Sequence, residues 1–246
     1  MTTVVREKDA PKYYEVKRHL LGLIPDCGPD VALPSERDLA SQLQTARSTV
    51  RQALAELVTE GRLERRHGSG TYVAEPKLAW PLQMSSFTEQ AAASGLTVTT
   101  SLLSAERIRA TAELAELLMI RAGAPVHRLE RIRRVNGSPM ALEQSHLSAT
   151  RLPGLAKAVR EAGSLYQVLF DQWGITIAGA IETIETAPAS LREAALLATD
   201  VGSPMMMLSR HSFDESNEPI EWVRSWYRGD RYKFVATLGF GKGPAR

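Results

Sequence analysis

Residues 33–73, LPSERDLASQLQTARSTVRQALAELVTEGRLERRHGSGTYV, decide the fold of the first third of the chain. Ser35 is a good helix N-cap and precedes an acidic first turn, so we expect a short helix that ends near Leu43. Only residues 44–47 separate it from a second apolar stripe of helical spacing, which Gly61 ends. Two short helices joined this tightly form a helix-turn-helix.

The segments on either side complete a small module. Residues 12–24, KYYEVKRHLLGLI, have apolar positions at helical spacing and predict a preceding helix, which ends before Pro25. Residues 62–76, RLERRHGSGTYVAEP, predict two strands joined at HGSG, which form a wing. The basic residues of the module crowd one stretch: Arg47, Arg51, Arg62, Arg65, Arg66 and His67. From pattern alone, this module is either a DNA-binding domain or a platform for protein interactions.

Three signatures in this stretch give a resemblance. The motifs P-S-E-R-x-L-A, R-x-T-V-R-x-A-L and G-x-G-T-[YF]-V are all present, and the module resembles the winged helix-turn-helix of the GntR family of bacterial transcription regulators. The resemblance implies a double-stranded DNA operator with palindromic half-sites, read by a homodimer. It implies that these residues meet DNA: Arg37, Arg47, Ser48, Thr49, Arg51, His67, Gly68, Ser69 and Gly70. Arginine is bidentate toward guanine, and glycine permits close backbone approach.

Composition limits the other possibilities. The 246 residues suit one large domain or two ordinary ones, and 43% hydrophobic with 24% charged residues is a globular composition. No apolar run reaches the roughly 18 residues of a membrane span, and the N-terminus lacks the apolar region of a signal peptide. We therefore expect a cytoplasmic protein. Cys27 is the only cysteine, so we expect no intrachain disulfide and no cysteine metal cluster. We also expect no other metal site and no cofactor.

The remainder of the chain nearly repeats itself. Residues 75–84 contain two prolines and no periodicity, which predicts a linker between a domain of residues 1–74 and one of residues 85–246. Beyond the linker, six residues recur 79 positions later: Leu117, Leu118, Gly123, Pro125, Leu129 and Arg131 correspond to Leu196, Leu197, Gly202, Pro204, Leu208 and Arg210. Each copy reads as strand, helix, turn and hairpin. Two copies predict an α+β domain with one antiparallel sheet, a pseudo-twofold axis and a pocket between its halves.

The hairpin RLERIRRVNGSPMALE, residues 128–143, carries an unusual face. Side chains two apart share a face of a strand, so Arg131 and Arg133 point the same way as the apolar residues beside them. A two-residue loop would set Arg131 opposite Leu142, whereas a three-residue loop with Gly137 at a bulge would set it opposite Glu143. The sequence allows both registers, and we expect the longer loop.

Three further segments offer polar groups to a small anion. Ser86, in a capping box with Glu89, and Ser164 each predict a helix N-terminus, whose free N–H groups and dipole attract anions. In residues 220–227 the side chains of Glu221, Val223, Ser225 and Tyr227 share one face of a strand. From pattern alone, that face is either ordinary solvated surface or part of a binding site.

The second part of the chain also carries a resemblance. Its segments SSFTEQAAASG, RIRRVNGSPMALEQSH, SLYQVL and EWVRSWYRGDRYKF resemble the UTRA domain of the HutC subfamily of GntR regulators, an effector-binding domain with a chorismate-lyase-like α/β fold. Residues 196–212 and 221–236 are especially similar to the amino-sugar regulators of that subfamily. The resemblance and the residue patterns together give this effector site: Ser86, Phe87, Arg131, Arg133, Glu143, Ser164, Tyr166, Glu221 and Tyr227.

We therefore expect a transcription repressor whose operator affinity depends on an amino-sugar phosphate, glucosamine 6-phosphate or N-acetylglucosamine 6-phosphate. The alternatives are other effectors of the subfamily, namely urocanate, another sugar phosphate or a fatty acyl compound. An enzyme related to chorismate lyase is the rival class. The chain shows no G-x-S-x-G, no H-E-x-x-H and no catalytic triad, and we interpret His127, His146 and His211 as structural.

Overall fold

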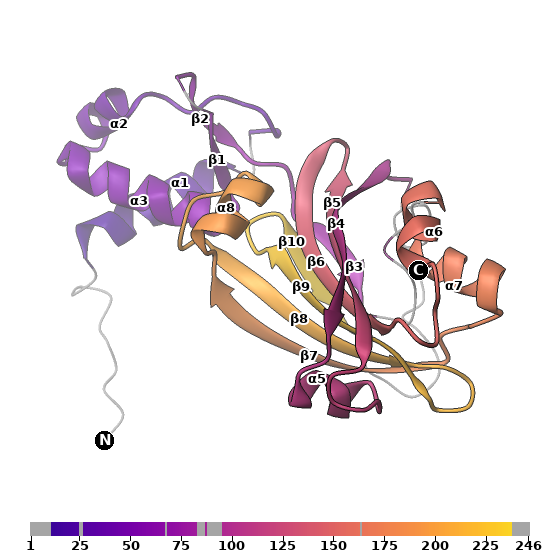
Figure 1. Cartoon of the computed structure of the whole chain (residues 1–246). Coiled ribbons are helices and arrows are strands. Elements are labelled where there is room, and N and C mark those ends of the chain that lie inside the picture. The colour runs from indigo at the N-terminus through magenta and orange to yellow at the C-terminus, as the bar shows by residue number, and fades with distance from the viewer. Residues whose placement is uncertain are drawn as a thin grey trace. The chain divides into compact units, whose positions relative to one another are not determined.

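The computed structural model describes residues 11–24, 27–66, 68–82, 87, 95–162 and 164–237 (Figure 1). They divide into two compact units. The N-terminal unit contains the residues up to Leu78 together with Gly229–Arg231. The C-terminal unit contains Ala79–Arg228 and the residues from Tyr232 onward. None of the described helices is long and apolar enough to cross a membrane.

The N-terminal unit is the expected winged helix-turn-helix. Its elements are α1 (Lys12–Leu23), α2 (Glu36–Gln42), α3 (Arg47–Thr59), β1 (Leu63–Arg66) and β2 (Gly70–Val73). Ser35 caps α2, as predicted, because its side chain accepts a hydrogen bond from the backbone N–H of Asp38. The apolar stripes of the three helices meet in one core, in which Leu20, Leu39 and Leu54 are almost fully buried.

The short segment Gly229–Arg231 packs within this unit, although it is distant in sequence. Lys77 Nζ donates to the carbonyl oxygen of Gly229 at 2.6 Å, and Arg231 pairs with Glu64 on β1. Glu64 also accepts from Arg66 Nε at 2.6 Å, so its carboxylate joins two arginines. These arginines lower the pKa of Glu64, although its partial burial acts in the opposite direction.

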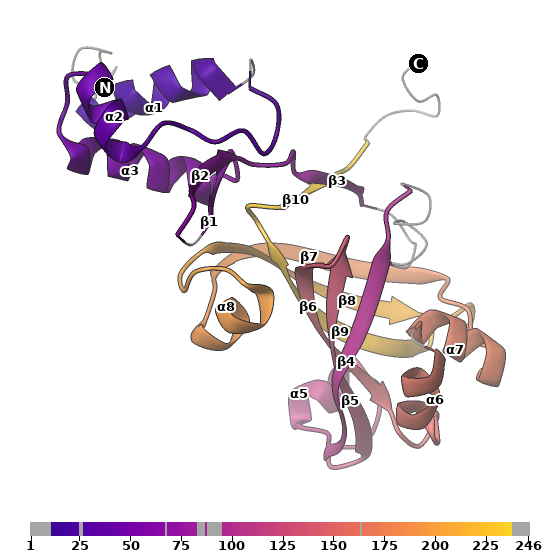
Figure 2. The same cartoon turned by 90° about the horizontal axis from the view of Figure 1, so that it is seen from above.

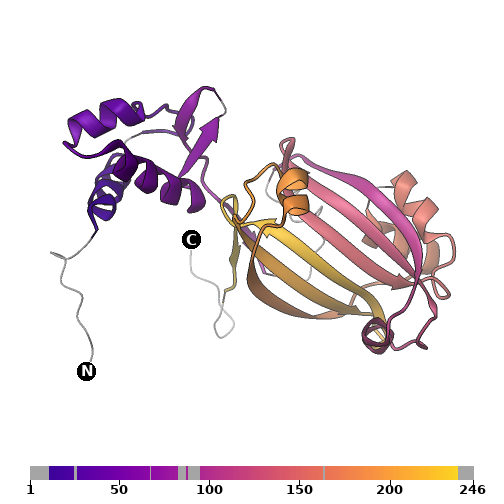
Figure 3. The same ribbon diagram turned by 60° about the vertical axis from the view of Figure 1, so that its left-hand side comes forward.

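The C-terminal unit is built on a six-stranded antiparallel sheet, which confirms the predicted α+β fold (Figure 3). The strand order is β4-β5-β6-β9-β8-β7. Helices α5 (Ala112–Leu117) and α8 (Leu191–Leu197) follow the first strand of each half, so both copies of the repeat fold as strand, helix and hairpin. The strands are β4 (Val98–Arg109), β5 (Pro125–Val135), β6 (Ser138–Ser148), β7 (Gly179–Pro188), β8 (Pro204–Phe213) and β9 (Pro219–Arg228).

Helices cover the two faces of the sheet differently. Helices α6 (Leu155–Ala162) and α7 (Leu165–Trp173) pack against Leu129 and Leu147. Helices α5 and α8 pack on the opposite face, where Ile132 belongs to the α8 cluster. Polar side chains occupy another part of the α6–α7 face of the sheet, and they form the site described below.

The expected linker contains a strand. Residues 78–81 form β3 (Leu78–Pro81), which pairs with β10 (Tyr232–Val235) in a separate two-stranded sheet (Figure 2). The Trp80 and Tyr232 rings lie 5.4 Å apart and join the two strands through their side chains. The prediction of an irregular segment at residues 75–84 was wrong here, because the partner strand lies about 150 residues away and leaves no local pattern.

The hairpin register confirms one expectation and corrects its reason. Arg131 lies opposite Glu143, as expected from the longer loop. However, Asn136 and Gly137 form a two-residue turn, with φ of 49° and 81°. The extra residue is Met140, at a bulge where the register shifts between Arg133 and Arg134. The bulge, not the turn, moves Glu143 opposite the arginine.

Gly61 permits a close approach within the N-terminal unit. Its φ is +68°, and a Cβ built on it would lie 1.9 Å from the backbone oxygen of Asp230. Gly68 has a similar φ of +71°, but a Cβ there would have no atom within 4 Å. An alanine at Gly68 would add backbone strain alone, whereas an alanine at Gly61 would add backbone strain and a steric clash.

We predict that Gly61→Ala destabilises the protein much more than Gly68→Ala. Both variants bear the cost of a left-handed alanine, about 1–2 kcal/mol. Gly61→Ala must also displace the Asp230 backbone, which adds about 1–3 kcal/mol. Urea unfolding of the full chain would measure the difference, and equal losses of unfolding free energy would contradict the close approach.

Candidate functional site

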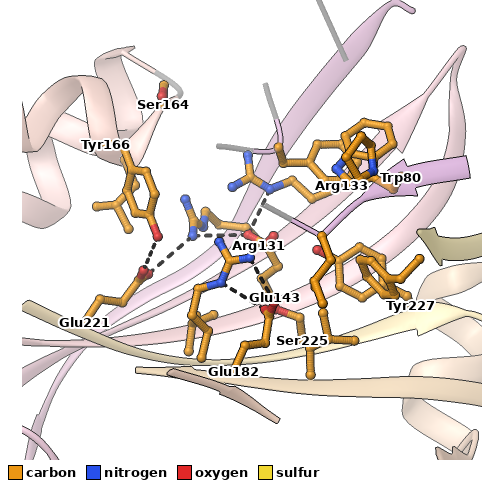
Figure 4. Close-up of a pocket in the computed structure, with 18 residues that line it drawn as sticks. Trp80, Arg131, Arg133, Glu143, Ser164, Tyr166, Glu182, Glu221, Ser225 and Tyr227 are labelled. Carbon is orange, nitrogen blue, oxygen red and sulfur yellow. Dashed lines mark hydrogen bonds and ion pairs between the residues drawn. The ribbon is translucent and has the colours of Figure 1, made fainter. Parts of the chain in front are cut away.

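A pocket opens on the α6–α7 face of the sheet in the C-terminal unit (Figure 4). It brings together eight of the nine residues predicted for the effector site; Ser86 lies outside the described residues. The pocket is lined by Trp80, Pro81, Leu82, Phe87, Arg131, Arg133, Glu143, Ser164, Leu165, Tyr166, Glu182, Leu208, Arg210, Glu221, Val223, Ser225, Tyr227 and Phe234.

Strand pairing explains why these residues meet. Arg131 lies opposite Glu143, Glu143 opposite Ser225, and Ser225 opposite Leu208, so one row crosses four strands on a single face. The predicted face of β9 is correct, since Glu221, Val223, Ser225 and Tyr227 all line the pocket. Side chains alternate between the two faces along each strand, and paired residues on neighbouring strands point to the same face. The register therefore brings side chains from distant parts of the sequence together.

Arg131 is the most buried cation of the pocket, with 3% of its surface exposed. Its Nη2 lies 3.2 Å from Glu143 Oε2, donates to Ser145 Oγ at 2.9 Å and lies 3.9 Å from Glu221 Oε1. Its Nε and Nη1 have no hydrogen-bond partner among the described residues. Burial and the neighbouring Arg133 lower its pKa. Buried donors without acceptors are costly, so these N–H groups gain most from a ligand oxygen.

Arg133 shares the same carboxylate. Its Nε donates to Glu143 Oε2 at 2.8 Å, its Nη1 donates to Thr100 Oγ1 at 2.6 Å, and its guanidinium lies 5.5 Å from the centre of the Phe87 ring. Burial alone would raise the pKa of Glu143, but Arg133 and Arg131 outweigh it and lower the pKa. Glu143 is therefore a carboxylate that holds two arginines in place.

A tyrosine and a second glutamate lie on the other side of Arg131. Tyr166 donates its hydroxyl hydrogen to Glu221 Oε2 at 3.1 Å. Burial and the Glu221 charge raise the pKa of Tyr166, and burial and Glu143 raise that of Tyr227. Both phenols stay protonated and can donate. Glu221 is 1% exposed, and its Oε1 has no hydrogen-bond partner among the described residues.

The sequence reasoning missed a third ion pair. Arg210 donates from Nε and Nη2 to the two carboxylate oxygens of Glu182, at 2.9 and 3.1 Å. Burial lowers the pKa of Arg210, but its hydrogen bonds to Glu182 prevail and raise it. The sequence repeat, in which Arg210 corresponds to Arg131, could have identified Arg210 as a pocket residue. No sequence signal identifies Trp80 or Phe234, because their strands β3 and β10 pair with each other although they are about 150 residues apart.

The predicted helix cap is present, and two predicted structural histidines lie elsewhere. Ser164 Oγ accepts from the backbone N–H of Gln167 at 3.5 Å and caps α7 beside the pocket. His127 Nε2 bonds the carbonyl oxygen of Leu152 at 2.9 Å. His146 packs on Trp222, and burial lowers its pKa to about 4. Neither histidine lines the pocket.

The N-terminal unit presents the predicted DNA-contacting residues on its surface. Arg47, Ser48 and Thr49 occupy the first turn of α3, after the N-cap Ala46. Arg37 on α2 is 82% exposed. Gly68, Ser69 and Gly70 form the exposed tip of the wing, and His67 lies outside the described residues. The exposed N-terminal end of this helix is the part that meets base edges in helix-turn-helix proteins.

Arg51 is exposed but already paired. Its Nε and Nη2 donate to Glu36 Oε2 at 3.1 and 3.0 Å, which links α3 to α2. This bond raises the pKa of Arg51. The exposed pair fixes the direction of the guanidinium and adds little stability.

Comparison with known proteins follows the same division. Residues 12–73 match the model of bacterial regulatory proteins of the gntR family, and residues 93–233 match the UTRA domain. The chain belongs to the GntR family. This GntR protein is a DNA-binding transcriptional regulator with an effector-binding UTRA domain, as are the repressors PhnF and NagR described next, and it does not belong to an enzyme family.

Two relatives show how far the similarity extends. The repressor PhnF of Mycolicibacterium smegmatis is 44% identical and covers 83% of each chain. The repressor NagR of Bacillus subtilis is 36% identical over 94% of this GntR protein and 96% of its own length. The crystal structure of PhnF from Mycobacterium smegmatis superposes with a TM-score of 0.64 and 40% identity, covering 92% of this chain and all of that one. This GntR protein is therefore more similar to PhnF than to NagR, although residues 196–212 and 221–236 led us to expect a special similarity to the amino-sugar regulators of the subfamily.

We predict that Glu143→Gln lowers the unfolding free energy by about 3 kcal/mol near pH 7, because it leaves two buried arginines without their carboxylate. The pKa of Glu143 lies below its ordinary 4.5, so its contribution is complete above that pH and is lost as the pH falls through the folded-state pKa. Urea unfolding at several pH values would test this. The exposed Glu185→Gln is the control, and a loss independent of pH would contradict the ion-pair explanation.

For DNA recognition, we predict that Arg51→Ala costs about 1–3 kcal/mol of operator affinity. The experiment is a gel-shift titration on a duplex selected by the wild-type protein from a random pool. Arg121→Ala, at an exposed arginine of the C-terminal unit, should bind like wild type. Unchanged affinity of the Arg51 variant would show that Arg51 does not contact the groove.

Proposed function

We propose that the effector is an amino-sugar phosphate, glucosamine 6-phosphate or N-acetylglucosamine 6-phosphate, and that it controls operator binding. The main support is Arg131 in the pocket wall beside Arg133, because its donor nitrogens Nε and Nη1 have no hydrogen-bond partner among the described residues. Arginine donors of this kind suit phosphate oxygens. Ser164 adds the N-terminus of α7, whose free N–H groups and dipole favour an anion.

The hydrogen-bond acceptors in the pocket support a sugar as the other part of the effector. Glu143, Glu221 and Tyr227 supply carboxylate acceptors and a protonated phenol, which suit hydroxyl and amine groups. A fatty acyl effector would need a long apolar tunnel, whereas the described lining contains three arginines and three glutamates. Urocanate offers one carboxylate, which uses fewer of these groups.

The relatives of this GntR protein are named for different small molecules. A probable fructoselysine utilization repressor of Escherichia coli is 27% identical, and a histidine utilization repressor of Pseudomonas putida is also 27% identical. Similarity alone therefore leaves the effector open, and the proposal depends on the pocket.

For the mechanism, we propose a homodimer whose winged helices read palindromic half-sites about 34–36 Å apart. DNA contacts then come from Arg37, the first turn of α3 and the wing tip. An effector that converts mostly bound into mostly released protein must favour the released state by about 10⁴-fold. Two occupied pockets per dimer would supply this jointly.

We expect isothermal titration to show saturable binding of one phosphosugar per chain. Arg131→Met should weaken it about tenfold or more, because a charge-assisted hydrogen bond contributes about 1.5–3 kcal/mol. Arg128→Met is the matched control, since Arg128 lies on the same strand but on the opposite face and pairs with Glu106 at 2.6 Å. Absence of binding for both phosphosugars at millimolar concentration would refute the proposal.

A further inference from the structure

The function proposed above assigns no ligand contact to the Glu182–Arg210 pair. Glu182 on β7, which Figure 4 labels, lies directly opposite Arg210 on β8, and both residues line the pocket. The side chains are 14% and 20% exposed, so the pair is largely removed from water. Because Arg210 is held by both carboxylate oxygens of Glu182, its charge is neutralised within the pocket wall.

The described lining of the pocket is balanced in charge. Among the described lining residues, three arginines face three glutamates: Arg131, Arg133 and Arg210, and Glu143, Glu182 and Glu221. Glu143 already holds two of the arginines, and Glu182 holds the third. A phosphate that enters therefore adds negative charge to a neutral and poorly solvated site.

A positive group on the ligand would offset that added charge. Glu221 Oε1 is buried without a hydrogen-bond partner among the described residues, and it is the acceptor that an ammonium group would satisfy. A hydroxyl or an acetamide at the same position carries no charge and leaves the imbalance in place. A tenfold difference in affinity corresponds to only about 1.4 kcal/mol. Charge interactions in a largely buried pocket exceed this energy, so they can decide which ligand binds more tightly.

We infer that Glu182 determines specificity: by neutralising Arg210 it keeps the pocket electrically balanced, and the pocket then favours a phosphosugar with a free amine over its hydroxyl or N-acetyl counterpart. This inference rests on the proposed function and narrows it to glucosamine 6-phosphate. Glu182 does not need to touch the ligand for this role. It acts as a positioning residue, because it holds Arg210 and neutralises its charge.

The test is isothermal titration near pH 7 with glucosamine 6-phosphate and glucose 6-phosphate, which differ only in the amine. The wild-type chain should prefer the amino sugar by about tenfold. Glu182→Gln keeps the size of the side chain but frees the Arg210 charge, so it should bind glucose 6-phosphate about tenfold more tightly and reduce the preference. Glu185→Gln, exposed on the other face of the same strand, is the control and should leave the preference unchanged.

A second variant gives the opposite sign. Arg210→Gln leaves the Glu182 charge without its partner, so it should weaken binding of both sugars and increase the preference for the amine. An unchanged ratio of the two affinities in Glu182→Gln, or shifts of the same sign in the two variants, would overturn the inference.

Titration with inorganic phosphate distinguishes a failure of this inference from a failure of the proposed effector. If the wild-type chain binds neither phosphosugar, the proposed effector is wrong, and phosphate affinity then decides about Glu182. Tighter phosphate binding by Glu182→Gln than by wild type supports its charge role. Equal phosphate binding by the two proteins overturns it.

Discussion

The C-terminal unit depends on one constraint, that arginines buried in a sheet need carboxylates within reach. Glu143 meets it for Arg131 and Arg133 at 3.2 and 2.8 Å, and only because a bulge at Met140 moves the register of the hairpin. Without the bulge an apolar residue would lie opposite Arg131, and Arg131 and Arg133 would lose Glu143 as their shared counter-ion. A single extra residue in one strand thus allows a charged pocket inside an otherwise apolar fold.

The repeat supplies the frame of the pocket, and departures from the repeat supply its chemistry. Both halves fold as strand, helix and hairpin, and Arg131 and Arg210 occupy corresponding positions. Their partners differ, since Arg131 uses Glu143 on the following strand whereas Arg210 uses Glu182 on the preceding one. Arg133 corresponds to Ser212, so the second half lacks its second arginine. One asymmetric ligand fits this arrangement better than two equivalent ones.

Local patterns predicted most of the fold, and long-range pairing accounts for the rest. The helix-turn-helix, the wing and the sheet of two halves followed from caps, apolar spacing and the repeat. The pairing of Arg131 with Glu143 was right, but its cause was a bulge at Met140, which the turn sequence did not predict. Glu182 requires the register of β7 against β8, and β3 requires a partner about 150 residues away. Neither leaves a mark within a short window of sequence.

The segment Gly229–Arg231 has a consequence for how this architecture is divided. It belongs to the compact N-terminal unit, although the chain reaches it only after completing β9 of the other unit. The DNA-binding module is therefore discontinuous in the gene. A fragment cut after Leu78 would lack the residues that meet Gly61 and Glu64. A chimera that exchanges the C-terminal unit at this boundary would therefore have to keep Gly229–Arg231, or a compatible loop, for the N-terminal unit to pack in the same way.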